Sequence, residues 1–208
     1  MPSTLYGARG SGSSVVEMAC AHLGLDVAIY DLDVRNGEHR GETYRAINPA
    51  AKMPTLVFDD GETVTESAAI LITLDERHPE GGLLPPTGTK ARAQALRWMF
   101  FVVTELYGLV DLIDRPHLVA PPEGAPYVKA QAEGLWRDRW LQVEAAIAGA
   151  PYLLPHGFCA TDLYISNFTR WDMEPRWRAE HLPKIEALAT AVSERPALAE
   201  AWARHCPS

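Results

Sequence analysis

The chain has 208 residues, of which 47% are hydrophobic and 22% charged, a composition typical of a protein folded throughout. Its formal net charge of -8 disfavours a nucleic-acid binder, because neutralising phosphates requires clustered Lys and Arg. No apolar run reaches the roughly 18 residues of a membrane span, and the N-terminus lacks the apolar core of a signal peptide, so we expect a cytoplasmic protein with no membrane partner.

The first part of the chain predicts a β-α-β unit. Residues 4–8 (TLYGA) and 27–34 (VAIYDLDV) have the content of strands, and residues 14–24 (SVVEMACAHLG) have a helical apolar period. Gly24 stands where a helix C-cap is expected, so the helix should end there. Serines and glycines fill the segment between the first strand and the helix, ARGSGSS at residues 8–14.

A hairpin and a second helix follow the polar segment after residue 34. Asp60-Gly61, a dipeptide suited to tight hairpin turns, lies between the β-prone runs of residues 55–66 (TLVFDDGETVTE). Residues 67–78 (SAAILITLDERH) predict the helix. This order of elements is compatible with a thioredoxin-like α/β domain, which we place at residues 1–78.

Pro and Gly concentrate in residues 79–89, which predicts a linker between domains. The strand signal is weak beyond it, and wide apolar stripes predict long helices at 90–113 and 130–150. Three shorter helices fit around 160–172, 182–194 and 197–205. We therefore expect an all-α helical bundle over residues 90–208.

The three cysteines, Cys20, Cys159 and Cys206, are odd in number and widely spaced. They match neither a disulfide framework nor a zinc cluster, so we expect reduced thiols and no metal site. Cys20 falls on the apolar side of the first helix and reads as a small buried residue, whereas Cys206 is expected to be exposed.

Residues 48–70 (NPAAKMPTLVFDDGETVTESAAI) resemble the glutathione transferases, and the resemblance extends from TLYGARGSGSS to SERPALAEAWA. Two later segments, TELYGL and TDLYISNFTRW, are most similar to the bacterial beta class. The resemblance implies that glutathione is the co-substrate and that the protein is a homodimer. It also implies that the second substrate is a small hydrophobic electrophile, as in detoxification.

The resemblance assigns the glutathione site to two dipeptides. In the family the proline of Met53-Pro54 is cis, and Met53 pairs with the cysteinyl backbone of glutathione; the alternative is a proline that starts an edge strand. Ser67 is expected to cap the following helix and take the γ-glutamyl carboxylate, while Glu66 takes the amine; the alternative is ordinary capping. Lys52 is the best candidate for the glycyl carboxylate.

Arg35, His39 and Arg40 are further candidates for the glycyl carboxylate, although a solvated surface charge is the simpler interpretation of each. In the beta class, residues aligned with Thr104 and Glu105 reach the glutathione of the neighbouring subunit. The resemblance therefore extends the binding site to both positions.

The beta-class catalytic cysteine aligns with Gly12, and the histidine-lysine pair of that class aligns with Tyr107 and Gly108. The catalytic half of the pattern is therefore altered. Gly12 remains a candidate for glutathione binding, because Gly10 and Gly12 fit a backbone that must approach a ligand closely. Ser11 is the first candidate for the hydroxyl that hydrogen-bonds the glutathione thiol, Ser13 is the second and Ser14 the third, with helix capping as the alternative.

Tyr107 is a second candidate donor and, with Trp171, a candidate for the second-substrate pocket, unless both are core aromatics. Asp162 belongs to a family capping motif in which Cys159 replaces the usual Ser or Thr. A thiol is a poor cap acceptor, so Thr161 substitutes or the helix start is weaker.

These residues predict a glutathione transferase that activates the glutathione thiol for attack on a hydrophobic electrophile. Without a cysteine at the helix start, mixed-disulfide chemistry is disfavoured. The alternative is a non-catalytic glutathione-transferase-like binding or scaffold protein, which the replacements at Gly12 and Gly108 favour.

Overall fold

The structure, a computed structural model, describes residues 2–171 and 174–205, which fall into two units. The first unit contains the chain up to Pro86 and again from Ala191, and the second spans Thr87–Thr190. Among the described residues, no helix combines the length and apolar content needed to cross a membrane. The prediction for Cys206 lies outside the described residues.

The first unit is built on a four-stranded mixed sheet. Its strands are β1 (Ser3–Gly7), β2 (Val27–Asp31), β3 (Thr55–Val57) and β4 (Thr63–Thr65). Their order is β2-β1-β3-β4, with β1 parallel to β2 and antiparallel to β3, and β3 antiparallel to β4. The predicted hairpin is therefore present.

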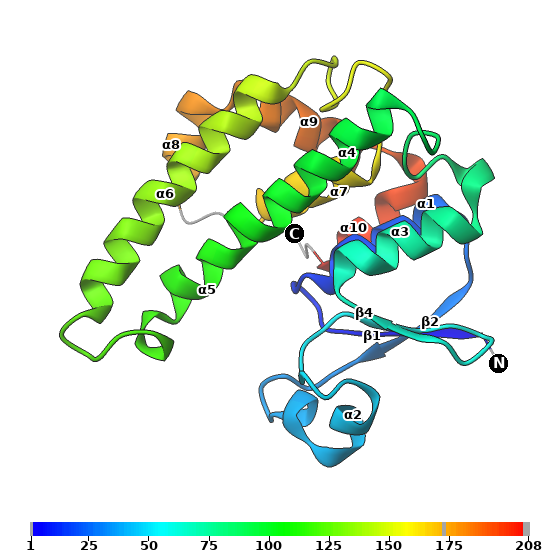
Figure 1. Ribbon diagram of the computed structural model, residues 1–208, viewed down its shortest axis with the longest axis horizontal. Coiled ribbons are helices and arrows are strands. Elements are labelled where there is room, and N and C mark those ends of the chain that lie inside the picture. The colour runs from blue at the N-terminus through cyan, green and yellow to red at the C-terminus, as the bar shows by residue number, and fades with distance from the viewer. Residues whose placement is uncertain (1, 172–173, 206–208) are drawn as a thin grey trace. The chain divides into compact units, whose positions relative to one another are not determined.

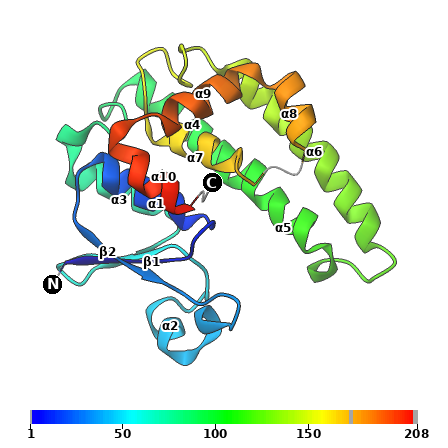
Figure 2. The ribbon, with the colours of Figure 1, turned by 180° about the vertical axis from the view of Figure 1, so that it is seen from behind.

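Helices cover both faces of this sheet (Figures 1 and 2). Two lie on the same face as the C-terminal helix, α1 (Ser13–His22) and α3 (Ser67–Arg77), and the opposite face carries α2 (Glu42–Ile47). The predicted polar segment thus contains a short helix, α2, and a 3₁₀ turn at Glu38–Arg40. The arrangement confirms the thioredoxin-like α/β fold of the N-terminal domain.

The end of α1 shows how closely local sequence determines this part of the fold. Gly24 has φ 66°, a left-handed conformation that favours glycine. Its N–H donates to the carbonyl of Ala21 (3.1 Å), and Leu25 N–H donates to the carbonyl of Cys20 (3.0 Å). This pair of bonds is a Schellman motif, which satisfies the last carbonyls of the helix. The predicted end of the helix is confirmed.

The second unit is helical. Its helices are α4 (Lys90–Phe101), α5 (Gly108–Asp114), α6 (Ala125–Ala146), α7 (Ala160–Phe168), α8 (Pro175–His181) and the start of α9 (Pro183–Ser193). A π-helical segment, Val102–Tyr107, joins α4 to α5. The sequence did not predict α8 as a separate helix.

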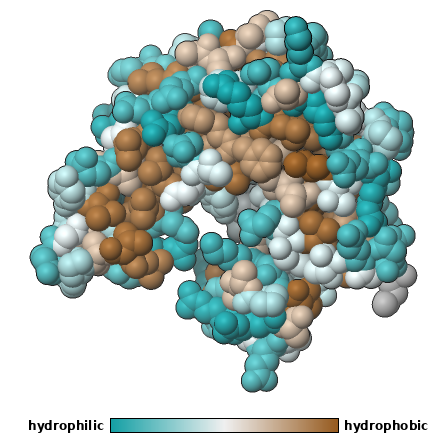
Figure 3. Space-filling model, viewed as in Figure 1, coloured by the Kyte–Doolittle hydropathy of each residue, from teal (hydrophilic) through white to brown (hydrophobic). Residues whose placement is uncertain are grey.

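The core of the second unit is α7, all of whose residues are buried. Trp140 of α6 is fully buried as well. Elsewhere the unit exposes apolar surface: Leu118 and Val119, in the turn between α5 and α6, are 63% and 62% exposed. Figure 3 shows apolar atoms, in brown, gathered over this turn and the neighbouring parts of α5 and α6.

The C-terminal helix changes the predicted domain boundary. Instead of joining the helical bundle of residues 90–208, α10 (Ala199–His205) and the preceding 3₁₀ turn (Pro196–Leu198) belong to the first unit and contact α1. Polar contacts as well as apolar packing hold α10 on the first unit, because Arg204 of α10 binds carboxylates on α1 and β2. The predicted linker ends near the observed boundary after Pro86.

Arg204 joins three elements of the first unit. Its Nε donates to Glu17 of α1 (2.8 Å), and its terminal nitrogens donate to both carboxylate oxygens of Asp31 in β2 (2.8 and 3.0 Å). Burial alone would raise the pKa of the Glu17 carboxyl, but hydrogen bonds from His205 and Arg204 outweigh burial and hold it below the ordinary value of 4.5. Glu17 is therefore ionised near neutral pH.

At the start of α7, Cys159 is the N-cap residue, and its side chain accepts from the N–H of Asp162. The Asp162 carboxylate in turn accepts from the N–H groups of Cys159 and Leu153, both at 2.8 Å. Thr161 does not substitute as the cap, because its hydroxyl donates to the carbonyl of Ala95 in α4 (2.9 Å). The family motif is thus intact with sulfur as one acceptor.

We expect Cys159→Ser to raise the free energy of unfolding by about 1 kcal/mol, because a hydroxyl is a better N-cap acceptor than a thiol. Urea unfolding measures the change. Cys20→Ser is the matched control: Cys20 is buried within α1, so the added hydroxyl should lower stability by about 1 kcal/mol. Equal effects of the two substitutions would contradict the capping role of Cys159.

We expect Glu17→Gln to lower the free energy of unfolding near neutral pH by about 2 kcal/mol, because Arg204 loses a buried charged acceptor. The pKa of Glu17 is lowered in the folded state, so its contribution is complete above pH 4.5 and is lost as the pH falls through the folded value. The difference between the two proteins should therefore shrink on acidification. Glu76→Gln, at an exposed position of α3, is the control.

Candidate functional site

The register of the sheet brings the three candidate segments to one edge. Tyr6, near the end of β1, pairs with Thr55, the first residue of β3, and Thr55 pairs with Thr65, the last residue of β4. Adjacent strands lie about 4.8 Å apart. The segment after β1, Met53-Pro54 before β3 and Glu66-Ser67 after β4 therefore all leave the sheet side by side.

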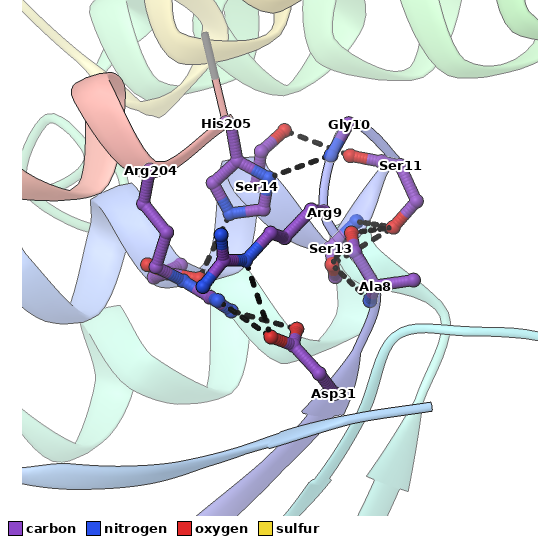
Figure 4. A network of polar contacts seen from close by, with 10 residues as sticks. Ala8, Arg9, Gly10, Ser11, Ser13, Ser14, Asp31, Arg204 and His205 are labelled. Atoms are coloured by element: carbon purple, nitrogen blue, oxygen red, sulfur yellow. Dashed lines mark hydrogen bonds and ion pairs between the residues drawn. The ribbon is translucent and has the colours of Figure 1, made fainter. Parts of the chain in front are cut away.

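The segment between β1 and α1 is a tight turn held by its own serines (Figure 4). Ser11 donates its N–H to the carbonyl of Ala8 (3.1 Å), and its hydroxyl donates to the same carbonyl (2.7 Å). The Ser13 hydroxyl accepts from the N–H of Ala8 (3.1 Å) and lies 2.9 Å from the Ser11 hydroxyl. The Ser14 hydroxyl donates to the carbonyl of Ser11 (2.9 Å).

None of the three serines is the N-cap residue of α1, which is Gly12. The alternative interpretation, in which one of these serines is the N-cap residue, is therefore wrong for that position. The Ser11 hydroxyl nevertheless performs part of the role, because it accepts the N–H of Ser13 (3.2 Å). The first turn of α1 therefore has a hydroxyl beside its N–H groups, where a negative charge is stabilised.

Burial separates the two leading candidates. Ser13 is 1% exposed, and its hydroxyl accepts from the N–H of Ala8 and donates to the carbonyl of Ala8. Ser11 is half-buried, and so are the hydrogen bonds of its hydroxyl to Ala8 and Ser13. Because Ser13 also donates to the Ala8 carbonyl (3.2 Å), Ser11 can turn its proton away from that carbonyl without leaving it unpaired. The geometry favours Ser11 as a donor to a ligand.

Two glycines make this turn possible. A Cβ on Gly7 would lie 2.4 Å from the Ser13 hydroxyl oxygen, so a larger residue would displace that serine. Gly10 has φ 70° and leaves space for a Cβ, so its requirement is conformational. Gly12 has helical backbone angles, φ -63° and ψ -11°, so its role is not a left-handed turn.

Met53-Pro54 is a cis peptide, as the resemblance implied. Pro54 is buried, whereas the preceding Lys52 is exposed. The backbone on both sides of the dipeptide is held by Tyr44: its hydroxyl donates to the carbonyl of Lys52 (2.6 Å) and lies 2.8 Å from the hydroxyl of Thr55.

Asn48 binds the same two groups as Tyr44. Its side-chain N–H groups donate to the Lys52 carbonyl (2.7 Å) and to the Thr55 hydroxyl (3.0 Å). The sequence analysis assigned no role to Tyr44 or Asn48. Asn48-Pro49 is a turn signal, but nothing in the linear sequence indicated that these side chains reach across to Thr55. Both are buried, at 2% and 3% exposure.

Glu66 and Ser67 differ from the prediction in their positions. Glu66, rather than Ser67, is the N-cap residue of α3, and Ser67 is the first helical residue. Glu66 has φ 64° and ψ 112°, a sparsely populated conformation for a residue with a side chain. Such conformations concentrate at ligand sites. Since Ile70 N–H is bonded to the Glu66 carbonyl, the N–H groups of Ser67 and its two successors precede the first helical bond.

The other candidates for binding the glycyl carboxylate, Arg35, His39 and Arg40, precede Lys52 in the sequence. Arg35 and Arg40 are exposed and His39 is half-buried. Within residues 2–171 and 174–205, the Nδ1 atom of His39 is buried and has no hydrogen-bond partner.

In the second unit, Tyr107 and Trp171 form an aromatic cluster with Phe168. The rings of Tyr107 and Trp171 are stacked at 5.3 Å, and both contact Phe168 edge-on. Phe168 is buried, but Tyr107 and Trp171 are half-exposed, so both interpretations, core and pocket, have support.

Thr104 and Glu105 are exposed on the π-helical segment. Glu105 accepts from Arg139 of α6 (2.9 Å), and the Thr104 hydroxyl donates to the carbonyl of Phe100 (2.9 Å).

The described cysteines do not provide a reactive thiol. Cys20 and Cys159 are both free and buried. Burial raises the pKa of each thiol to about 12. Neither lies in the turn before α1, so thiol chemistry at this edge of the sheet requires a sulfur supplied by a ligand.

Comparison with known proteins gives a consistent family. Residues 13–77 match the family described as glutathione S-transferase, N-terminal domain. The chain is 27% identical to glutathione S-transferase GstA of Escherichia coli O157:H7, covering 95% of this chain and 96% of that protein. It is 26% identical to the uncharacterized GST-like protein YncG of Escherichia coli K12, over 97% of each.

A solved structure is also similar over the whole chain. The glutathione transferase homolog from Sulfitobacter, determined with bound glutathione, has a TM-score of 0.87 and 25% identity, covering 96% of each chain. Together with the edge of the sheet described above, these comparisons show that the chain belongs to the glutathione S-transferase superfamily.

Proposed function

We propose that the first unit binds glutathione and activates its thiol for attack on a hydrophobic electrophile, which makes the protein a glutathione transferase. The observation that carries the proposal is the convergence of the α1 turn, Met53-Pro54 and Glu66-Ser67 at one edge of the sheet. The glutathione bound to the similar Sulfitobacter protein supports the choice of ligand.

Each end of the tripeptide has a complementary group. The backbone of Met53, held from behind by Tyr44 and Asn48, pairs with the cysteinyl residue as an added strand would. The Ser67 hydroxyl and the N–H groups at the start of α3 donate to the γ-glutamyl carboxylate, and the Glu66 carboxylate accepts from the amine. Lys52, exposed beside Met53, meets the glycyl carboxylate.

The thiol then lies at the turn before α1. Lowering its pKa by two units requires about 2.7 kcal/mol in favour of the thiolate. One charge-assisted hydrogen bond from the Ser11 hydroxyl contributes about 1.5–3 kcal/mol, and the helix N-terminus adds about 0.3–1 kcal/mol. These two effects are sufficient without a cysteine of the protein.

The reaction is a conjugation. The glutathione thiol loses its proton to solvent, and the sulfur then donates an electron pair to an electrophilic carbon and forms a C–S bond. Where the electrophile carries a leaving group, that group departs with the electron pair of its bond to carbon. Tyr107, stacked on Trp171, is the candidate for contacting the electrophile.

We propose that the protein acts as a homodimer. Thr104 is exposed one helical turn after Phe100, which is 48% exposed, so both side chains lie on one face. Exposed apolar side chains also occur on α6, where Leu135 and Leu141 are 43% and 42% exposed. A partner that covers these helices would bring Thr104 and Glu105 to the glutathione of the neighbouring subunit.

We expect the protein to be retained on immobilised glutathione, and Ser67→Ala to weaken its affinity for glutathione about tenfold, because a carboxylate loses one hydrogen bond. Calorimetric titration measures the dissociation constant. Thr73→Ala, which removes a hydroxyl further along α3, is the matched control and should bind as the wild type does. A folded protein that does not bind glutathione would favour the scaffold alternative.

We expect Ser11→Ala to raise the pKa of the bound glutathione thiol by about one unit, which corresponds to about 1.4 kcal/mol of thiolate stabilisation. The thiolate absorbance of the complex as a function of pH measures this change. Ser3→Ala, at the other end of β1, is the control. An unchanged titration for Ser11→Ala would remove Ser11 from this role and direct attention to Ser13→Ala and Tyr107→Phe.

A further inference from the structure

The turn that carries Ser11 is bound to the C-terminal helix by a histidine (Figure 4). Gly10 donates its N–H to Nδ1 of His205 (3.1 Å), and Nε2 of the same ring lies 2.8 Å from a carboxylate oxygen of Glu17 in α1. His205 and Glu17 are buried, at 6% and 8% exposure. One imidazole thus bridges the backbone of the turn and a buried carboxylate.

The direction of these bonds fixes the state of the ring. The N–H of Gly10 requires the lone pair of Nδ1, so the ring proton is on Nε2 and is donated to Glu17. The other oxygen of Glu17 accepts from Arg204, which also binds Asp31 of β2. Arg9, in the turn itself, lies 3.5 Å from Asp31. The charged side chains of the network that includes the ring therefore come from α1, α10, β2 and the turn.

The hydrogen bond between the turn and His205 is made at Gly10, where a change in the backbone affects Ser11. It has φ 70°, and it immediately precedes Ser11, whose N–H and hydroxyl both return to the Ala8 carbonyl. The N–H of Gly10 belongs to the Arg9–Gly10 peptide, and rotation of that peptide would change the backbone angles of Gly10 and so redirect the Ser11 hydroxyl. The His205 bond restrains the Arg9–Gly10 peptide.

We infer that His205 is a positioning residue that sets the direction of the Ser11 hydroxyl through the N–H of Gly10. This role rests on the proposed activation of a glutathione thiol by Ser11. His205 does not contact the ligand; it acts through the backbone of the turn. A purely structural role, in which His205 only docks α10 on Glu17, is the competing explanation.

Two substitutions separate these roles. The side-chain oxygen of Asn occupies about the place of imidazole Nδ1, so His205→Asn retains an acceptor for Gly10 and loses the contact with Glu17. The amide nitrogen of Gln reaches about the place of Nε2, so His205→Gln retains a donor to Glu17 and loses the acceptor for Gly10. Both variants place a neutral amide at the same buried position.

The test measures three quantities in each variant: amide hydrogen exchange of Gly10, the dissociation constant of glutathione and the pKa of its bound thiol. His205→Gln should accelerate Gly10 exchange about tenfold, weaken glutathione binding about tenfold and return the thiol pKa toward its value in free glutathione. His205→Asn should retain near wild-type values for all three. Equal losses in the two variants, or unchanged Gly10 exchange in His205→Gln, would overturn the inference.

A measurement on the wild-type protein keeps the inference testable if both variants unfold. The hydrogen bond from Gly10 N–H to Nδ1 of His205 should give a scalar coupling between the two nitrogens in the NMR spectrum of the wild type, with and without glutathione. Absence of this coupling in the glutathione complex would refute the role of His205. Failure of the wild type to bind glutathione would instead overturn the proposed function, and this role with it.

Discussion

The candidate site depends on the antiparallel pairing of β1 with β3. Tyr6 opposite Thr55, and Thr55 opposite Thr65, align the end of β1, the start of β3 and the end of β4. Because each chain segment leaves the sheet at this edge, a turn, a cis proline and a helix start separated by many residues become neighbours. A slip of one residue in this register would move the three segments apart and turn each side chain to the other face.

Buried polar side chains hold the segments in place once the strands have aligned them. Tyr44 and Asn48 bind the backbone on both sides of Met53-Pro54, and the Ser13 hydroxyl binds both backbone groups of Ala8. These groups are directional, whereas apolar packing is not. Hydrogen bonds therefore define the edge of the sheet that carries the candidate site. Apolar residues of α1, α3 and the sheet provide the scaffold beneath it.

The proposed function does not require a cysteine at the helix start. The protein's described thiols are buried and have raised pKa values, so they are unreactive. A hydroxyl and backbone N–H groups can instead stabilise the thiolate of a bound ligand. The histidine that restrains this turn comes from α10, nearly the whole length of the chain away, so activation of the proposed thiol depends on how the C-terminal helix docks on α1.

The sequence alone determined the elements whose signals are local. The strand periods, the Asp60-Gly61 hairpin and the Gly24 helix end are set by residues within a few positions of one another, and the Met53-Pro54 and Glu66-Ser67 pairs could be identified from the family resemblance. Tertiary structure alone decided that α10 packs on the first unit, that α8 is a separate helix, and that Glu66 precedes α3 as its cap. It also decided that Ser11 is more accessible than Ser13, and that Tyr44, Asn48 and His205 support the site. The physical reason is that these outcomes depend on burial and on hydrogen bonds between residues distant in sequence, which no local pattern encodes.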